Sequence, residues 1–297
     1  MPEYQRIDFR DQISRNKWQS FFLMAIIFAI IIALAYVISY VYDPAYSFFI
    51  LIIAIIFSMI YILISYYNSD KIAIASVSAK EAKQSEYRDY HNLVEGISIA
   101  SGLPKPRLYI MESNQINAFA SGRDPEHAVI CATTGALEKL DRRELEGVLS
   151  HEMSHIANFD IRYMTFVAVM VGMIAIISEI FLRSLWMKGN DREGKSGIII
   201  ILIGVLLAIL APIVVKFVQF AISRKREYSA DASAVKFTRY PKGLINALKK
   251  IQQDYKSPEE NKKVPKAVAP LFFANPFKNL TSTHPPINER IRILESM

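Results

Sequence analysis

Four long apolar runs constrain the fold of this 297-residue chain more than any other feature of its sequence. Residues 21–42 and 46–67 contain no charged side chain, and two further runs cover residues 163–186 and 197–222. An α-helix rises about 1.5 Å per residue, so the first run alone would reach about 33 Å, enough to cross the hydrocarbon core of a bilayer. Because the apolar residues are clustered rather than spread at helical intervals, we predict a mostly α-helical membrane protein with four transmembrane helices and a soluble part.

The charges around the first two runs predict their orientation. Asp43 and Pro44 form a tight break between the runs, and this break contains no Lys or Arg. Basic residues flank the pair on both outer sides, at Arg15, Lys17, Lys71, Lys80 and Lys83. The positive-inside rule therefore places both flanks, and the start of the soluble part, in the cytoplasm. The first run is too long for a signal peptide and no small-residue cleavage site follows it, so we expect it to be retained.

The second pair of runs is less regular, because Glu179, Arg183 and Lys216 interrupt it. Glu179 and Arg183 are one helical turn apart and could pair, whereas Lys216 is near enough to the end of its run to reach the membrane surface. We expect a second hairpin that returns the chain to the cytoplasm. The alternative is that these two runs are partly buried within the protein.

The composition argues against two other classes of protein. The net charge is +7, but no basic stripe with interleaved aromatic residues lies outside the apolar runs, so we expect no nucleic-acid binding. Residues 189–196 (GNDREGKS) match the P-loop pattern, but apolar runs stand where a buried strand and a soluble helix would be needed. We therefore expect no nucleotide site and reject a transporter ATPase. The single cysteine, Cys131, excludes an internal disulfide and fits a reducing compartment.

The motif HEMSH at residues 151–155 predicts a metal site. His151 and His155 are four residues apart, so on a helix they share one face and can bind a single ion, while Glu152 can act as general base. Zinc suits imidazole ligands, and a catalytic zinc takes three protein ligands and a water. Asp141 and Glu144 predict a capping box at the start of this helix, with an apolar stripe of Leu145, Val148, Leu149 and Ile156. The alternative is a chance match in which the two histidines serve packing or lie on the surface.

Glu227 is the candidate for the third ligand. It lies in REYSAD (residues 226–231), and Asp231 follows one helical turn later, where its carboxylate can fix the orientation of a ligand histidine. Two apolar runs separate His155 from Glu227, which keeps both on the same side of the membrane. The alternative is that Glu227 only forms salt bridges with Arg224 and Arg226.

Between the second and third runs the pattern predicts a helix at residues 76–100 and then a small sheet. The strand-like segments are residues 107–111, 117–120 and 128–133. An edge strand beside a metal site can bind an extended peptide through its main chain. His91 and His127 are isolated, so we expect surface or structural roles for them.

After Asp231 the sequence predicts further helices. Pro241 and Gly243 interrupt the chain before an amphipathic helix at residues 244–255, and residues 257–270 read as a charged loop. Residues 271–277 (LFFANPF) could pack on the soluble domain or dip into the membrane surface.

The last helix is predicted to start at Pro285 and Pro286, just after His284, which is as compatible with a turn as with a site. Its apolar face carries Ile287, Ile291 and Leu294.

Together these motifs resemble the HtpX-type membrane zinc metalloproteases, relatives of the CAAX prenyl-protein endopeptidases. The resemblance covers nearly the whole chain. Its motifs are NAFASG (117–122), HEMSHIANFD (151–160), REYSAD (226–231) and STHPP (282–286), followed by Arg290.

The resemblance implies one Zn²⁺ per chain bound by His151, His155 and Glu227, with Glu152 catalytic and Asp231 steadying a ligand histidine. It also implies candidate contacts with the substrate or the transition state, made by Asn117, Ala118, Phe119, His284 and Arg290. Oxyanion stabilisation by His284 is a hypothesis. The expected fold is a cytoplasmic zincin-like α+β domain on four transmembrane helices. The implied function is quality control of membrane proteins at the bacterial plasma membrane.

We therefore expect peptide-bond hydrolysis by a zinc-activated water, with misfolded membrane proteins or unfolded polypeptides as substrates and the lipid bilayer as a partner. His155 precedes the third run by about 12 Å along a continuous helix, which would hold the zinc close to the membrane. The alternative is a non-proteolytic membrane chaperone or scaffold with a structural metal site, although such sites normally have four protein ligands. The expected organisation is residues 1–20, a hairpin at 21–67, a first domain part at 68–160, a hairpin at 161–222 and a second domain part at 223–297.

Overall fold

The computed structural model describes residues 47–166, 224–254, 271–274 and 285–297, with scattered helical positions between residues 14 and 32. Several expectations therefore lie outside the described residues. They are most of the first apolar run, the third run after residue 166, the fourth run, the P-loop match at 189–196 and His284.

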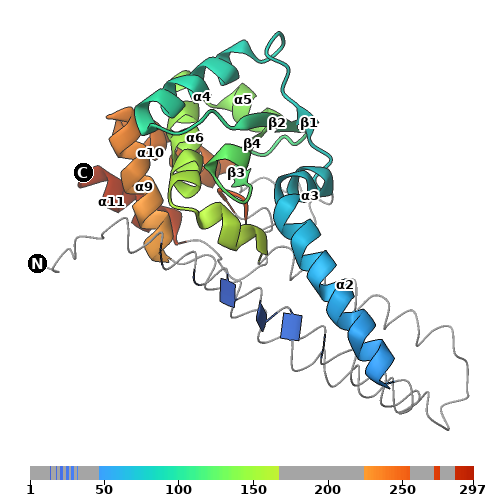
Figure 1. Cartoon of the computed structure of the whole chain (residues 1–297). Helices are drawn as coiled ribbons and strands as arrows, with labels where there is room; N and C mark the ends of the chain where they lie inside the picture. The colour runs from blue at the N-terminus through green and yellow to red at the C-terminus, as the bar shows by residue number, and fades with distance from the viewer. Residues whose placement is uncertain are drawn as a thin grey trace, which may run out of the picture.

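The second apolar run forms helix α2 (Ser47–Tyr67), which confirms the helix predicted at residues 46–67. In Figure 1 it extends away from the sheet and the other labelled helices, and most of its large apolar side chains are exposed, with Phe48 70% accessible. Helix α3 (Ser69–Ser76) follows at a sharp bend. Within the described residues no single helix is long and apolar enough to cross a membrane, although residues Leu51–Tyr67 and α3 meet that criterion as a pair bent by 77°.

Four strands form one sheet in the order β1-β2-β4-β3. The strands are β1 (Lys80–Glu81), β2 (Arg107–Met111), β3 (Ala118–Ser121) and β4 (Val129–Thr133). Strand β2 runs parallel to β4, whereas β1 and β3 are antiparallel to their neighbours. The three predicted strands are confirmed to within one residue. Every residue of β3 and β4 is buried, so this half of the sheet is covered on both faces.

The helix predicted at residues 76–100 is wrong in its first half. Helix α3 ends at Ser76, and Lys80 and Glu81 then pair with Ile110 and Tyr109 as strand β1. Helix α4 begins only at Arg88 and runs to Ser101. The apolar residues before Arg88 belong to different clusters, because Val77 packs with α3 and Ala82 packs beneath α4. Gly102, at φ 71°, ends α4 in the left-handed conformation that glycine accommodates.

Helix α6 (Arg142–Ala157) is the centre of the described domain, as Figure 1 shows. The predicted capping box is confirmed: the Asp141 carboxylate accepts hydrogen bonds from the Arg143 and Glu144 amides, and the Glu144 carboxylate accepts one from the Asp141 amide. The predicted stripe is buried, with Val148, Leu149 and Ile156 inaccessible. The short elements before α6 are the 3₁₀ helix Pro125–His127 and helix α5 (Thr134–Lys139).

Helices α9 (Arg224–Thr238) and α10 (Pro241–Asp254) pack against α6, and α11 (Ile287–Glu295) packs on α10 and α9. Helix α10 approaches so closely that a Cβ atom on Gly147 would lie 2.7 Å from the Leu244 backbone nitrogen. The predicted break is observed between Thr238 and Pro241, but the next helix begins three residues earlier than expected, at Pro241 instead of residue 244. Proline suits the first turn, where a backbone N–H has no helical partner.

The C-terminal expectations are confirmed for the described residues. Helix α11 follows Pro286, and Ile291 and Leu294 are buried. Residues 271–274 are also buried, and Phe272 forms an antiparallel bridge to Phe119 in β3. Of the two alternatives for this apolar stretch, packing on the domain is therefore observed for residues 271–274. The described chain is mostly helical with a small sheet.

Candidate metal centre and active site

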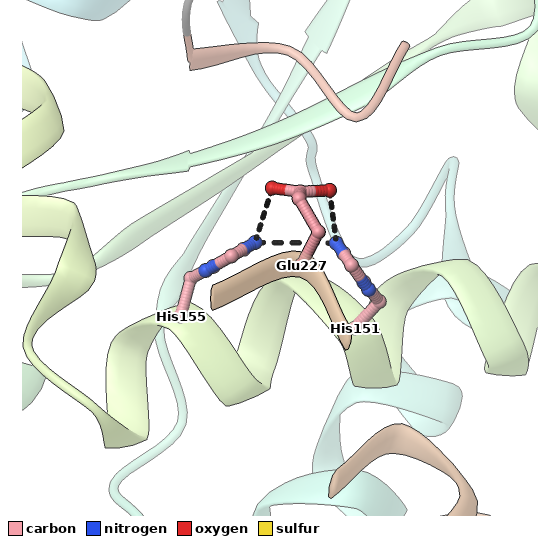
Figure 2. A group of neighbouring side chains, drawn as sticks. All are labelled: His151, His155 and Glu227. Atoms are coloured by element: carbon pink, nitrogen blue, oxygen red, sulfur yellow. Dashed lines mark hydrogen bonds and ion pairs between the residues drawn. The ribbon is translucent and has the colours of Figure 1, made fainter. Parts of the chain in front are cut away.

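Helix α6 brings the two histidines of the motif together. His151 and His155 lie one turn apart on a buried face, and their Nε2 atoms are 3.2 Å apart. Glu227, from α9, faces both rings: its Oε2 is 3.7 Å from His151 Nε2 and its Oε1 is 3.7 Å from His155 Nε2 (Figure 2). Three candidate metal ligands, two from α6 and one from α9, therefore face the same point.

Hydrogen bonds on the far side of each ring fix its orientation. His151 Nδ1 lies 2.9 Å from the Asp231 carboxylate, and His155 Nδ1 lies 3.0 Å from the Asp160 carboxylate. An ionised carboxylate accepts hydrogen bonds, so each Nδ1 donates its proton. When both rings are neutral, the two Nε2 lone pairs face each other, an arrangement that a shared cation would stabilise.

The donor set fits a divalent ion. The ligand atoms of His151, His155 and Glu227 all lie within 4.8 Å of one another, and all three residues are buried. Ligand atoms around a tetrahedral zinc with bonds near 2.0 Å are about 3.3 Å apart, close to the separations found here. The salt-bridge alternative for Glu227 does not describe this arrangement, because Arg226 instead pairs with Asp160 and lies over the Tyr163 ring.

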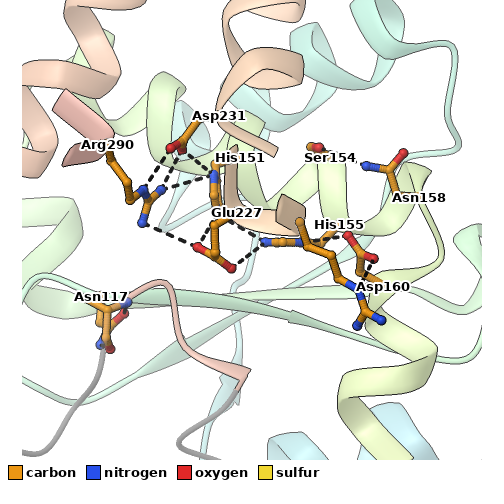
Figure 3. A network of polar contacts seen from close by, with 11 residues as sticks. Asn117, His151, Ser154, His155, Asn158, Asp160, Glu227, Asp231 and Arg290 are labelled. Carbon is orange, nitrogen blue, oxygen red and sulfur yellow. Dashed lines mark hydrogen bonds and ion pairs between the residues drawn. The ribbon is translucent and has the colours of Figure 1, made fainter. Parts of the chain in front are cut away.

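Asp160 is a site residue that the sequence analysis missed. Helix α6 ends at Ala157, Phe159 takes a positive φ of 58°, and a new helical segment starts at Asp160. The expectation of one continuous helix from His155 into the third apolar run is therefore wrong. The break turns the chain so that the Asp160 carboxylate reaches back to His155 (Figure 3). The available signal was an acidic residue five positions after the last histidine of the motif.

Arg290 lies fully buried on the opposite side of the site. Its Nη2 donates to Asp231 Oδ1 at 2.6 Å and its Nε donates to Asp231 Oδ2 at 2.9 Å, a two-point pair. Its Nη1 is 3.5 Å from Glu227 Oε2. The structure pairs Arg290 with Asp231, so that it holds the carboxylate that orients His151 (Figure 3). The expectation that Arg290 also contacts the substrate or the transition state stays a prediction.

Glu152 lies beside the three donors and is 2% exposed. Burial raises the pKa of its carboxyl to about 7; the charge of Glu227 adds to this rise, while His155 and the backbone amide of Ala120 oppose it. Glu152 Oε1 has no hydrogen-bond partner among the residues that the structure describes. A buried carboxyl group whose pKa is close to neutral pH is suited to proton transfer.

The two imidazoles differ in acidity. Burial and the charge of Arg290 lower the pKa of His151 to about 4, against the opposing effect of Asp231. Burial also lowers the pKa of His155, but the hydrogen bond and charge of Asp160 and the charge of Glu227 outweigh it and raise that pKa to about 9. A bound cation would keep both Nε2 atoms deprotonated.

The expected substrate-binding strand borders this site. The Asn117 side chain and the Ala118 carbonyl contact residues 273 and 274, whereas the Phe119 ring points to Phe272. The isolated histidines lie elsewhere, with His91 bound to the Ala82 carbonyl and His127 to Asp124, as expected for structural roles.

Residues 84–297 match the model of peptidase family M48. The chain belongs to this family. It is 46% identical over 255 residues to "Protease HtpX homolog" of Caldanaerobacter subterraneus subsp. tengcongensis, which covers 83% of this chain and 84% of that protein. It is 40% identical over 295 residues to the protein of the same name from Dictyoglomus turgidum, covering 97% of this chain and 95% of that one. The crystal structure of S. mikatae Ste24p is also similar, with a TM-score of 0.48 and 18% identity, covering 81% of this chain and 57% of that one.

Membership of family M48 makes this chain a metalloprotease. Its matched region contains Glu152 and the three buried donors His151, His155 and Glu227. The site is assembled from helices α6, α9 and α11 and from strand β3 of the M48 domain.

Proposed function

We propose that this M48 protein is a zinc-dependent endopeptidase with one Zn²⁺ per chain. The observation that carries the proposal is the convergence of His151, His155 and Glu227 on one point beside Glu152. Three protein donors with an adjacent buried carboxylate are the arrangement of a catalytic zinc site, whereas a structural site would use four protein ligands.

In this mechanism the two Nε2 atoms and the Glu227 carboxylate hold the ion. A bound zinc ion supplies two effects: it lowers the pKa of a water molecule and polarises the scissile carbonyl. Glu152 would accept the proton of the attacking water and deliver it to the leaving amine. Asp231 and Asp160 keep the Nδ1 protons in place, so that both Nε2 atoms stay directed at the ion.

We further propose that the enzyme is embedded in the bacterial plasma membrane by four transmembrane helices and cleaves misfolded or damaged membrane proteins at the cytoplasmic face. The four apolar runs, the basic flanks of the first pair and the exposed apolar side chains of α2 support this proposal. Its partners are then membrane-protein or unfolded polypeptide substrates and the lipid bilayer, without nucleic acid or nucleotide.

The test of the chemistry is cleavage of unfolded casein by detergent-purified protein, with zinc content determined in parallel, for the wild type and Glu152→Gln. We expect both proteins to bind zinc and only the wild type to cleave. If both bind zinc and neither cleaves in any lipid or detergent, a non-proteolytic scaffold replaces the enzyme. Equal cleavage by both would exclude Glu152 as the base.

The topology has a separate test. A protease-sensitive tag after residue 297 should be digested only in inside-out vesicles, whereas a tag in the break between the first two runs should be digested only in right-side-out vesicles. The opposite pattern would overturn the proposed orientation.

A further inference from the structure

The outer edge of β3 is occupied by another part of the same chain. Strand β3 is the last strand of the sheet, so its outer main-chain groups would be available to pair with an extended peptide. Instead, residues 271–274 lie along this edge, more than a hundred residues later in sequence, with an antiparallel bridge between Phe119 and Phe272. All four residues are buried.

Three further hydrogen bonds hold the segment at this edge. The Phe273 amide donates to the Ala118 carbonyl at 2.8 Å. The Asn117 side chain completes the pairing like a peptide group: its Nδ2 donates to the Ala274 carbonyl at 2.7 Å, and its Oδ1 accepts from the Ala274 amide at 3.1 Å. This is the way in which a bound peptide adds to a sheet edge.

The side chain of Phe273 lies within the candidate active site. Its ring packs edge-on against the His151 ring, with centroids 4.8 Å apart, and the Arg290 guanidinium lies 4.7 Å from its centre. Phe272 points to the other side, onto Phe119. The two neighbouring aromatic rings therefore face opposite ways, one toward a candidate metal ligand and the other into the core.

The candidate site is buried, and Phe273 contributes to covering His151. His151, Glu152, His155 and Glu227 are each at most 4% exposed. A polypeptide that pairs with β3 at these positions must displace the hydrogen bonds from Phe273 to the Ala118 carbonyl and between Ala274 and the Asn117 side chain.

We propose that Leu271–Ala274 occupies the substrate's own position, and that the pocket between His151 and Arg290 is the subsite for an aromatic side chain of the substrate. This inference rests on the proposed peptidase function and adds the substrate register. The substrate binds antiparallel to β3 and donates a backbone N–H to the Ala118 carbonyl. The N–H and C=O groups of its next residue form hydrogen bonds with the side-chain amide of Asn117. Arg290 forms an ion pair with Asp231 and places its planar, charged guanidinium over the Phe273 ring, a contact that favours an aromatic ring over an aliphatic side chain.

The segment is therefore an intramolecular competitor of the substrate. If it is docked in about nine of ten molecules, the apparent dissociation constant of a substrate is about tenfold larger than the intrinsic one. Loosening the segment should tighten substrate binding even though it removes contacts from the folded protein.

The test measures binding rather than cleavage, so that it is independent of the proposed chemistry. Full-length, zinc-loaded Glu152→Gln protein in detergent is titrated with two fluorescent unfolded peptides that differ only by Phe or Ala at one position. Two variants of this protein are titrated in the same way. Phe273→Ala empties the pocket, whereas Ala274→Pro removes the N–H donated to Asn117 and keeps the Phe273 side chain. Leu248→Ala is the matched control, because Leu248 is equally buried in the core but lies on α10.

We expect Phe273→Ala to bind the Phe peptide about tenfold more tightly and to increase its preference over the Ala peptide. Ala274→Pro should tighten binding of both peptides, and Leu248→Ala should change neither. In the unsubstituted segment, hydrogen exchange of the Phe273 amide should accelerate when the Phe peptide binds.

The proposal is overturned if Phe273→Ala and Ala274→Pro bind both peptides no better than Leu248→Ala does. It is equally overturned if the Phe peptide binds while exchange at Phe273 stays unchanged, because the segment is then a permanent strand. Casein cleavage without these effects would leave the peptidase function standing and remove this inference alone. Peptide binding that displaces the segment, without cleavage of casein, would support this inference and contradict the peptidase function.

Discussion

At the scale of single residues, two carboxylates determine how the metal ligands point. Asp231 is held by Arg290 and Asp160 by Arg226, so each histidine is backed by a carboxylate that is itself paired with an arginine. Such outer hydrogen bonds fix the tautomer of a ligand imidazole and increase its basicity. The consequence is that metal affinity depends on residues that do not touch the metal.

Replacing Asp160 by Asn tests this dependence. We expect zinc affinity to fall by about 10- to 100-fold, because an amide no longer stabilises the Nδ1 proton of His155 as a carboxylate does. Competition with a chromophoric chelator measures the change. Asp124→Asn is the control, since Asp124 also hydrogen-bonds an imidazole, that of His127, but away from the site. Equal affinities for wild type and Asp160→Asn would show that Asp160 does not act through the ligand.

Cys131 gives the protein a predictable sensitivity to alkaline pH. Burial raises the pKa of this thiol well above its ordinary value, so the folded protein keeps it protonated. The unfolded thiol ionises above about pH 8.5, so the stabilisation is complete below that pH and is lost as the pH rises. Between pH 8 and pH 10 the wild type should lose about 2 kcal/mol more unfolding free energy than Cys131→Ala. Urea unfolding at both pH values measures this difference, and parallel losses in the two proteins would contradict it.

At the scale of elements, α6 depends on its first turn. The Asp141 carboxylate accepts from two amides that have no helical partner, and its loss should cost about 1 kcal/mol. Thermal unfolding of Asp141→Ala measures this cost. Asp89→Ala is the control, because Asp89 is exposed in the first turn of α4, whose N-cap residue makes no side-chain cap. A midpoint for Asp141→Ala as high as that of Asp89→Ala would contradict the capping role.

These elements also show which features a sequence reveals. The capping box at Asp141 and the strand at Arg107–Met111 were predictable because their signals are local. The start of α4 was not, since residues 80–81 form a strand only by pairing with β2, which follows more than twenty residues later.

The same distinction between local signals and contacts of distant segments applies to the candidate site. The HExxH spacing and the REYSAD motif pointed to His151, His155 and Glu227, which the fold brings together. Asp160 was missed because its role depends on the turn at Phe159, and the occupancy of the β3 edge by Phe273 depends on a contact between distant segments.

At the scale of the whole molecule, the metal centre links regions that are remote in sequence. Two donors come from α6, the third comes from α9 after residues 167–223, and Arg290 reaches in from the last helix. Since these groups converge only in the folded chain, the free energy of metal binding is also free energy of folding.

Removing the metal should therefore lower the thermal stability of the whole domain. At a zinc concentration one hundred times its dissociation constant, binding contributes about 2.7 kcal/mol, which corresponds to a shift of about 5 to 10 °C in the unfolding midpoint. Scanning calorimetry with and without a chelator measures this shift. Added zinc should restore the midpoint and magnesium should not, because magnesium prefers oxygen ligands in an octahedral shell. Glu227→Ala, which lacks one of the three donors, should respond far less to the chelator. A midpoint that stays constant while the bound zinc is lost would show that the helices hold the site without help from the metal.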